Sequence, residues 1–293
     1  MIDKARYDKP RFGAIRRLFG GERPLERDHS LGARVLCIAS GKGGTGKSVV
    51  ATNLASLRAS RGEKVLLVDF DAGLANAHLL LGLAPRFDMG HVISGDVEAA
   101  DALIEGPEGL MLLSGGVGRH ALANPTRREL DRLFRALRPL EEEFDLVIID
   151  HGAGLGYGTV AHLAATSTLL IVTNPEVTAL SDSYALYKRA TMVNPHVVAG
   201  LVVNRCPTEA QANAGWDRFR GASERFLGHS PEYIGWIPSD DAVLQSVHER
   251  RPVGLTRPQS PAGIAIRTVS EWGPIDKART SRAFYEKARK ALR

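Results

Sequence analysis

Cysteine is scarce in this chain, and its scarcity excludes several kinds of site. Among 293 residues there are two cysteines, Cys37 and Cys206, and they do not form a C-x-x-C pair. A structural zinc site, an iron–sulfur carrier and a disulfide scaffold each require more thiols at closer spacing. The 9 histidines form no H-E-x-x-H or similar cluster, so we expect none of these metal sites.

Long apolar runs are also missing. No segment has the length and apolarity of a membrane-spanning helix, and the sequence shows no charged-then-apolar signal peptide. These absences predict a cytoplasmic protein. Aromatic residues make up 6% and hydrophobic residues 44%, which suits a soluble globule with a sizeable core. The net charge of +5 is modest and is compatible with a membrane surface, with nucleic acid or with neither.

A glycine-rich loop is the most informative motif. Positions 41–48 read GKGGTGKS, which fits the phosphate-binding pattern G-x-x-x-x-G-K-[ST]. An apolar run at 34–39 precedes the loop and an amphipathic run at 49–60 follows it, so the motif lies between a strand and a helix, as it requires. Backbone N–H groups of such a loop surround phosphate oxygens, while Lys47 reaches the β- and γ-phosphates and Ser48 binds Mg²⁺. The sequence therefore predicts a nucleoside triphosphate site with Mg²⁺ as its metal.

Strand and helix patterns alternate over most of the chain. Continuous apolar runs at 64–69 and 144–150 end in Asp, as expected of parallel strands buried on both faces. Further strands are expected at 110–114, 168–173, 198–203 and 233–237, and helices at 126–140, 178–192, 208–227 and 239–249. The alternation predicts a single α/β domain over 33–270, with a doubly wound, mostly parallel sheet flanked by helices.

Three aspartates follow two of these strands. Asp69 and Asp71 come at the end of the run 64–69, and Asp150 ends the run 144–150. Ligands of parallel sheets bind at the carboxyl ends of strands, so these side chains are expected beside the phosphate loop. Asp150 is the candidate for holding Mg²⁺ through a water, Asp69 for a second carboxylate on the metal side, and Asp71 for orienting the attacking water. Strand-terminal aspartates are also ordinary turn and cap residues, but three of them after a phosphate loop favour a functional site.

The form of the loop resembles one family in particular. K-G-G-x-G-K-[ST], with Lys42 as its first lysine, is similar to the deviant Walker A motif of the MinD/ParA (SIMIBI) ATPases. The segment VDFDAGLANAHLLLGL, the segment NPEVTALSDSYAL, and later blocks around residues 204 and 238 resemble the FlhG (FleN) subgroup of that family. The resemblance runs from about residue 33 to about residue 270 and implies a MinD-like P-loop NTPase fold.

The resemblance also implies roles for individual residues. In the family the first lysine crosses a dimer interface to the partner's nucleotide, so Lys42 joins Lys47 and Asp71 as a catalytic candidate, and the ATP state is expected to be a homodimer. An Asn-Arg pair and an Ile-Pro segment border the adenine. The expected nucleotide contacts are Gly43, Gly44, Thr45, Gly46, Lys47, Ser48, Val49, Asn204, Arg205 and Pro238, and the expected metal-side groups are Ser48, Asp69 and Asp150.

By the same resemblance, the protein is expected to hydrolyse ATP slowly under stimulation by a partner or a membrane, as a spatial or numerical regulator of flagellum assembly. An FlhF-like GTPase, a flagellar or transcriptional partner and the inner face of the cell membrane are the expected contacts. Two alternatives remain, a ParA-like partitioning or DNA-associated ATPase and a positioning ATPase at a pilus or secretion pole. The D-x-D-x-G-L-x-N form of residues 69–76 resembles MinD and FlhG more than ParA, so nucleic acid is the less favoured partner.

The chain departs from the family at two points. His151 follows Asp150 where the family usually has Thr. We expect either an ordinary loop residue there or a source of pH dependence near neutrality. The D-Q-A-x-x-L-R segment with which many FlhG proteins stimulate the partner GTPase is not visible in the sequence, and this puts an activator role in doubt.

Two basic segments flank the predicted domain. Residues 1–32 form an extension in which four apolar residues recur at helical spacing within 11–19. The spacing predicts a short amphipathic helix that lies on a bilayer, with a helix packed on the globule or a disordered arm as the alternatives. Residues 271–293 are expected to form a basic helix over 276–293 with few bulky apolar residues. A solvated surface helix is favoured there over a membrane contact, which would be mostly electrostatic.

Overall fold

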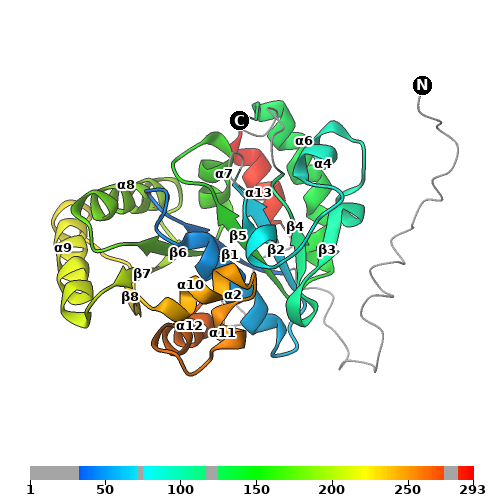
Figure 1. Ribbon diagram of the computed structural model, residues 1–293. Helices are drawn as coiled ribbons and strands as arrows, with labels where there is room; N and C mark the ends of the chain where they lie inside the picture. Colours follow the sequence, from blue (N-terminus) through cyan, green and yellow to red (C-terminus); the bar gives the residue numbers. More distant parts are fainter. Residues whose placement is uncertain (1–32, 72–74, 117–124, 274–282) are drawn as a thin grey trace, which may run out of the picture.

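The computed structural model of the chain describes residues 33–71, 75–116, 125–273 and 283–293 (Figure 1). The amphipathic helix predicted at 11–19, with the rest of the extension 1–32, lies outside the described residues. So do residues 274–282, which include the start of the basic helix predicted at 276–293.

One sheet organises the described residues, and its strands follow the order β3-β4-β2-β5-β1-β6-β7-β8. All neighbouring pairs are parallel except β3 and β4, which are antiparallel at one edge. The strand bounds are β1 (Arg34–Ala39), β2 (Val65–Phe70), β3 (Leu103–Glu105), β4 (Met111–Leu113), β5 (Leu146–His151), β6 (Thr168–Thr173), β7 (Val198–Cys206) and β8 (Glu232–Pro238). The predicted doubly wound, mostly parallel sheet is confirmed. Seven of its strands match the predictions at 34–39, 64–69, 110–114, 144–150, 168–173, 198–203 and 233–237.

Helices cover both faces of the sheet, which explains why its central strands are apolar on both sides. One face packs against α4 (Met89–Ser94), α6 (Arg127–Leu137), α7 (Tyr157–Ala165), α8 (Val177–Val193), α9 (Glu209–Leu227) and α13 (Phe284–Ala291). The other packs against α2 (Lys47–Ala59), α3 (Ala77–Leu80), α10 (Asp241–His248), α11 (Val253–Thr256) and α12 (Pro261–Glu271). In Figure 1 the group of α2, α10, α11 and α12 lies below the sheet, and α4, α6, α7 and α13 lie above it.

Local sequence signals explain where most helices begin. The capping box expected at 126–129 is present, because the Thr126 side chain accepts the backbone N–H of Glu129 and the Glu129 carboxylate accepts the N–H of Thr126. The helices predicted at 178–192, 208–227 and 239–249 correspond to α8, α9 and α10. Helices α7 and α12 were not predicted. Glycines precede and interrupt α7, and α12 begins with Pro261, a residue that suits the first helical turn as well as it suits a loop.

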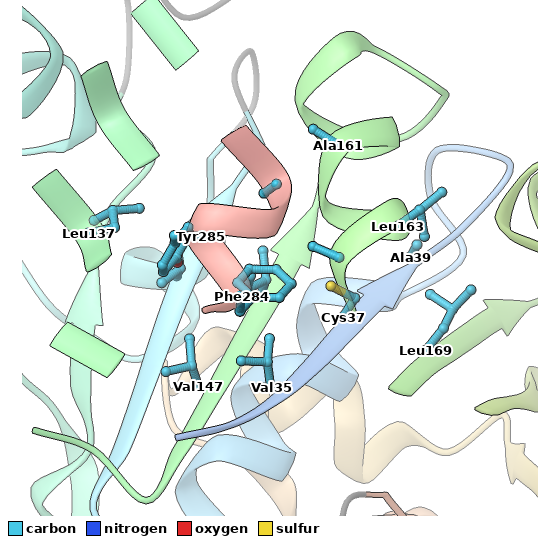
Figure 2. Close-up of a cluster of buried hydrophobic side chains, with 14 of the residues drawn as sticks. Val35, Cys37, Ala39, Leu137, Val147, Ala161, Leu163, Leu169, Phe284 and Tyr285 are labelled. Atoms are coloured by element: carbon cyan, nitrogen blue, oxygen red, sulfur yellow. The ribbon is translucent and has the colours of Figure 1, made fainter. Parts of the chain in front are cut away.

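The C-terminal helix differs from the expectation. Phe284, Tyr285, Ala288 and Leu292 are buried in the core that lies between the sheet and helices α6 and α7. Figure 2 shows the rings of Phe284 and Tyr285 reaching from α13 toward side chains of β1 and β5. The expectation of a solvated helix is therefore wrong for residues 284–292. Only the opposite side of α13, with Lys287, Lys290 and Arg293, is exposed.

Candidate functional site

The glycine-rich loop connects β1 to α2 at the carboxyl edge of the sheet. Gly44 and Gly46 adopt φ angles of 77° and 85°, in the left-handed region that favours glycine. Gly41 lies so close to α8 that a Cβ placed on it would be 2.1 Å from the Asp182 backbone. The chain passes from Gly46 directly into α2. The loop thus presents backbone N–H groups and the N-terminus of a helix to the same space, which is a geometry that binds anions.

Lys47 and Asp150 form a buried ion pair behind the loop. The Lys47 Nζ donates to Asp150 Oδ1 at 2.5 Å and lies 3.4 Å from the Ser48 hydroxyl. Asp150 is fully buried, and its other oxygen, Oδ2, has no hydrogen-bond partner among the described residues. Because an unshared buried carboxylate oxygen is costly, this atom is a good candidate to face a cation or a water bound to one.

Asp69 and Asp71 lie at the end of β2, next to the end of β5. Asp69 pairs in register with Asp150. Its Oδ1 accepts the N–H of Asp71 at 3.2 Å and its Oδ2 accepts the N–H of Ala77 at 3.0 Å, so both of its oxygens hold backbone groups that follow β2. Burial, and then the charge of Asp150, raise the pKa of the Asp69 carboxyl. Asp71 lines the cavity beside the loop.

Two adjoining cavities meet at the loop. One, of about 490 Å³, is lined by the loop residues from Gly43 to Val49 and by Asp71, Asn76, Leu80 and Val247. The other, of about 400 Å³, is lined by Val49, Asn204, Arg205, Ile237, Pro238 and Val243, among others. Gly46, Val49 and Val247 line both. The predicted phosphate-binding and adenine-binding residues are therefore brought to the same site.

Residues of the late strand β7 also hold the loop itself. The Asn204 side chain donates to the Thr45 carbonyl oxygen at 2.8 Å, and Arg205 donates to the Gly44 carbonyl oxygen at 3.0 Å. Arg205 adopts a φ of 58°, which is uncommon for a residue with a side chain. Sequence reasoning assigned these residues to the base alone, and it did not find their contacts with the loop backbone.

Lys42 has contacts separate from those of the Lys47–Asp150 pair. Its Nζ donates to Glu176 Oε2 at 2.8 Å and to Thr178 Oγ1 at 3.1 Å, at the start of α8. Both charged side chains are substantially exposed, 40% for Lys42 and 59% for Glu176. Glu176 and Thr178 were not predicted as site residues. The signal that could have found them is the Pro175-Glu176 pair directly after an apolar strand, at the same edge of the sheet.

His151 corrects an expectation from sequence. It is the last residue of β5 and fully buried, so it is not an ordinary loop residue. Its ring centroid lies 5.1 Å from that of His162 and 5.8 Å from that of Phe70, on the side of the sheet that faces α6, α7 and α13. Burial, and then the charge of Lys47, lower the pKa of His151 to about 3. The imidazole is therefore neutral near pH 7, and the expected titration near neutrality is wrong for this state.

The residues at this edge fit a nucleotide and a hard cation. The Ser48 hydroxyl and the carboxylates of Asp69 and Asp150 supply the oxygen ligands that Mg²⁺ prefers. Among the described residues no group of three or more His, Cys, Asp or Glu side chains is placed to hold a metal ion. A glycine loop between a parallel strand and a helix, with a lysine paired to the carboxylate of a neighbouring strand, defines a P-loop nucleoside triphosphatase.

Comparison with known proteins identifies the family. The chain matches a family described as an AAA domain over residues 33–201. It is 30% identical to the antiactivator FleN of Pseudomonas aeruginosa over 81% of this chain and 85% of that protein. It is 29% identical to the flagellum site-determining protein YlxH of Helicobacter pylori over 76% of each.

Similarity to solved structures supports the same family. The septum site-determining protein MinD of Pyrococcus horikoshii OT3, complexed with Mg-ADP, superposes with a TM-score of 0.69 at 26% identity, covering 84% of this chain and 96% of that one. The chain belongs to the MinD/ParA family of P-loop ATPases, and FleN is among its relatives, as the sequence motifs indicated. No helix in the described part of the chain is long and apolar enough to cross a membrane.

Proposed function

We propose that this protein binds ATP with Mg²⁺, dimerises in that state and hydrolyses ATP to ADP and phosphate. One observation carries the proposal. Lys47, Ser48, Asp71 and the Asp150 oxygen that has no partner in the described part of the chain converge where the loop meets the ends of β2 and β5, beside a cavity large enough for a nucleotide. The MinD structure solved with Mg-ADP supports the choice of nucleotide and metal.

The chain's own residues have separable tasks in this reaction. The loop amides and Lys47 would bind and neutralise phosphate oxygens, and the adenine would lie between Asn204, Arg205 and Pro238. Ser48, Asp69 and Asp150 would hold Mg²⁺, which supplies charge neutralisation when bound. Asp71, at the rim of the cavity, would orient the attacking water rather than bind the metal.

Lys42 gives the reason for a dimer. Among the described residues its amine donates to Glu176 and Thr178, while Lys47 pairs with Asp150. To act on a phosphate it must leave Glu176 or serve a nucleotide outside its own subunit. A lysine supplied in trans would stabilise transition-state charge as an arginine finger does, and it would make hydrolysis depend on dimerisation.

Light scattering combined with an ATPase assay tests the proposal. Asp71→Ala is expected to bind ATP and to remain a dimer, because water is no longer oriented for attack. Lys42→Ala is expected to retain ATP affinity and to lose hydrolysis by roughly 10³-fold, the lower end of the effect of an arginine finger. Lys47→Ala is the control that should lose nucleotide binding. A monomeric Asp71→Ala protein in ATP would contradict the dimer, and unchanged turnover of Lys42→Ala would contradict the trans role.

The process served is proposed to be the placement or number of flagella. FleN and the flagellum site-determining protein YlxH, both similar over most of their length, support this choice over DNA partitioning. An FlhF-like GTPase, a flagellar or transcriptional protein, and the cell membrane are the proposed contacts. Counting flagella on cells that lack the gene tests this role, and an unchanged number would contradict it.

A further inference from the structure

The ends of β2 and β5 present different chemistry to the two faces of the sheet. Successive strand residues point to opposite faces. Asp69 and Asp150 follow Leu67 and Ile148 toward α2 and the nucleotide site. Phe70 and His151, also paired in register, follow Val68 and Ile149 toward α6, α7 and α13. At the end of each strand, the residue next to the aspartate therefore packs into the core on the opposite face of the sheet.

Aromatic and imidazole rings fill the space behind these two strand ends. His162 of α7 is at the centre, with ring centroids 4.6 Å from Phe70, 4.7 Å from Phe134 and 5.1 Å from His151. Phe284 and Tyr285 of α13 close the cluster, at 5.3 and 5.9 Å from His162. The backbone of Gly158 presses on Phe70, because a Cβ there would lie 2.6 Å from its ring. Displacement of α13 would leave the rings that touch Phe70 and His151 without support.

This cluster is an unusual piece of core. Both ring nitrogens of His151, both of His162 and the Tyr285 hydroxyl are buried with no hydrogen-bond partner among the described residues. A buried polar group without a partner is destabilising, so apolar rings of similar size would make a more stable core. Proteins break the rules of core packing mainly at functional sites, and this break lies directly behind the catalytic carboxylates.

A separate contact anchors α13 over the cluster. The buried Glu141 carboxylate accepts the backbone N–H of Tyr285 at 2.7 Å and that of Phe284 at 3.2 Å. Arg289 donates to Asp131 of α6 at 2.8 Å on the exposed side. The rings of Phe284 and Tyr285 are thus positioned by hydrogen bonds to the backbone at the start of α13. The side-chain polar atoms of the cluster take no part in these hydrogen bonds.

We propose that α13 is a positioning element for the ATPase site, with Phe284 and Tyr285 as its positioning residues. Their rings press on His162, which fixes Phe70 and His151 and, through one peptide unit on each strand, Asp69, Asp71 and Asp150. The proposal rests on the proposed ATPase function for its kinetic consequence, but its structural consequence can be measured without hydrolysis. Three backbone N–H groups report the positions of the strand ends. Those of Asp71 and Ala77 donate to the Asp69 carboxylate, and that of Gly152 donates to the Phe70 carbonyl oxygen at 3.4 Å.

The test compares full-length variants by steady-state kinetics and by amide hydrogen exchange with ADP. Tyr285→Ala should lower kcat roughly tenfold, since small misplacements of catalytic groups have effects of this size, with KM for ATP nearly unchanged. Exchange at Asp71, Ala77 and Gly152 should become faster. Tyr285→Phe keeps the ring and should restore wild-type values. Phe219→Ala is the matched control, because Phe219 is a buried ring of α9 on the same face of the sheet, in contact with Tyr187 and Trp216.

The control separates positioning from general stability. Phe219→Ala should lower stability while kcat and the three amides stay at wild-type values. The proposal is overturned if Tyr285→Ala leaves kcat and these amides unchanged, or if Phe219→Ala alters them equally. A wild-type protein that hydrolyses no ATP would overturn the proposed function instead, and faster exchange in Tyr285→Ala would still support the positioning role of α13.

Discussion

At the residue scale, the two lysines of the loop have opposite surroundings. Lys47 is buried against Asp150, and Lys42 is exposed beside Glu176. A buried ion pair broken by removing one partner leaves an uncompensated charge, whereas an exposed pair contributes little to stability. Substitutions at Lys42 should therefore report on function with little effect on folding, and substitutions at Lys47 should affect both.

His162 gives the protein a stability that depends on pH. Burial, and then the neighbouring His151, lower its pKa well below the ordinary value of 6.5, so the folded protein keeps this ring neutral. The unfolded chain binds a proton there as the pH falls below 6.5, which means that the stability present above pH 6.5 is lost progressively below it. At pH 5.5 the loss through this one group should be about 1.4 kcal/mol.

Urea unfolding at pH 7.5 and pH 5.5 measures this effect. Between pH 7.5 and pH 5.5, the free energy of unfolding should fall less in His162→Leu than in the wild type. The difference should be about 1.4 kcal/mol, the contribution of His162. Because the comparison is between two proteins at the same pair of pH values, contributions from Asp69, Glu141 and His151 largely cancel. Equal losses in the two proteins would show that His162 is accessible to protons in the folded state.

At the element scale, α13 begins on a single buried carboxylate. Glu141→Ala would leave the N–H groups of Phe284 and Tyr285 buried without an acceptor, so we expect a loss of about 2–4 kcal/mol in the free energy of unfolding. Glu142→Ala is the matched control, because the neighbouring side chain is exposed and should change stability by less than about 0.5 kcal/mol. The midpoint of denaturant unfolding decides between them, and similar shifts in the two variants would contradict the anchoring role.

Elements with a strong local signal could be predicted from the sequence. The parallel strands are continuous apolar runs, and the loop at 41–48 and the aspartates that end β2 and β5 follow them directly. The sheet and the gathering of these residues at its carboxyl edge were therefore predictable. Helix α13 was misjudged because Phe284, Tyr285, Ala288 and Leu292 form a sparse apolar stripe within a basic segment. Its burial depends on a surface built by α6, α7 and the sheet, and no local pattern encodes that surface.

The candidate site also divides into residues that local motifs predict and contacts that depend on the tertiary fold. Lys47, Ser48, Asp69, Asp71 and Asp150 belong to motifs with fixed spacing. The contact of Lys42 with Glu176, and those of Asn204 and Arg205 with the loop carbonyls, join residues more than a hundred positions apart. Their partners are set by the strand order of the sheet, in which β1 lies beside β6 and β7 follows β6, and this order cannot be read from any single segment.

At the scale of the whole molecule, attachment to a membrane would depend on the flanking segments. The bulky apolar side chains of α13 are buried, so in this state the helix offers a bilayer Lys287, Lys290 and the small Ala291. The amphipathic pattern at 11–19 is then the better candidate for a hydrophobic contact. Deleting residues 1–21 should sharply reduce sedimentation with liposomes that contain anionic phospholipid.

Two comparisons make the liposome measurement decisive. Uncharged liposomes should pellet less of the full-length protein, because the basic residues gain attraction only from an anionic surface. High salt should release protein held by charge alone and spare protein held by inserted apolar side chains. Equal sedimentation of the deleted and full-length proteins on anionic liposomes would contradict the role of the N-terminal segment.

The placement of Phe284 and Tyr285 behind β2 and β5 also sets an order of events during synthesis. The phosphate loop and all three aspartates leave the ribosome long before residue 285 does. At typical translation rates, roughly 2–9 s separate Pro238, the last of the proposed nucleotide contacts, from Tyr285. If the rings of α13 complete the catalytic geometry, a nascent chain can already bind a nucleotide but cannot yet turn it over efficiently. ATP bound during that interval would persist, and the nucleotide would stabilise the young domain before the domain becomes an enzyme.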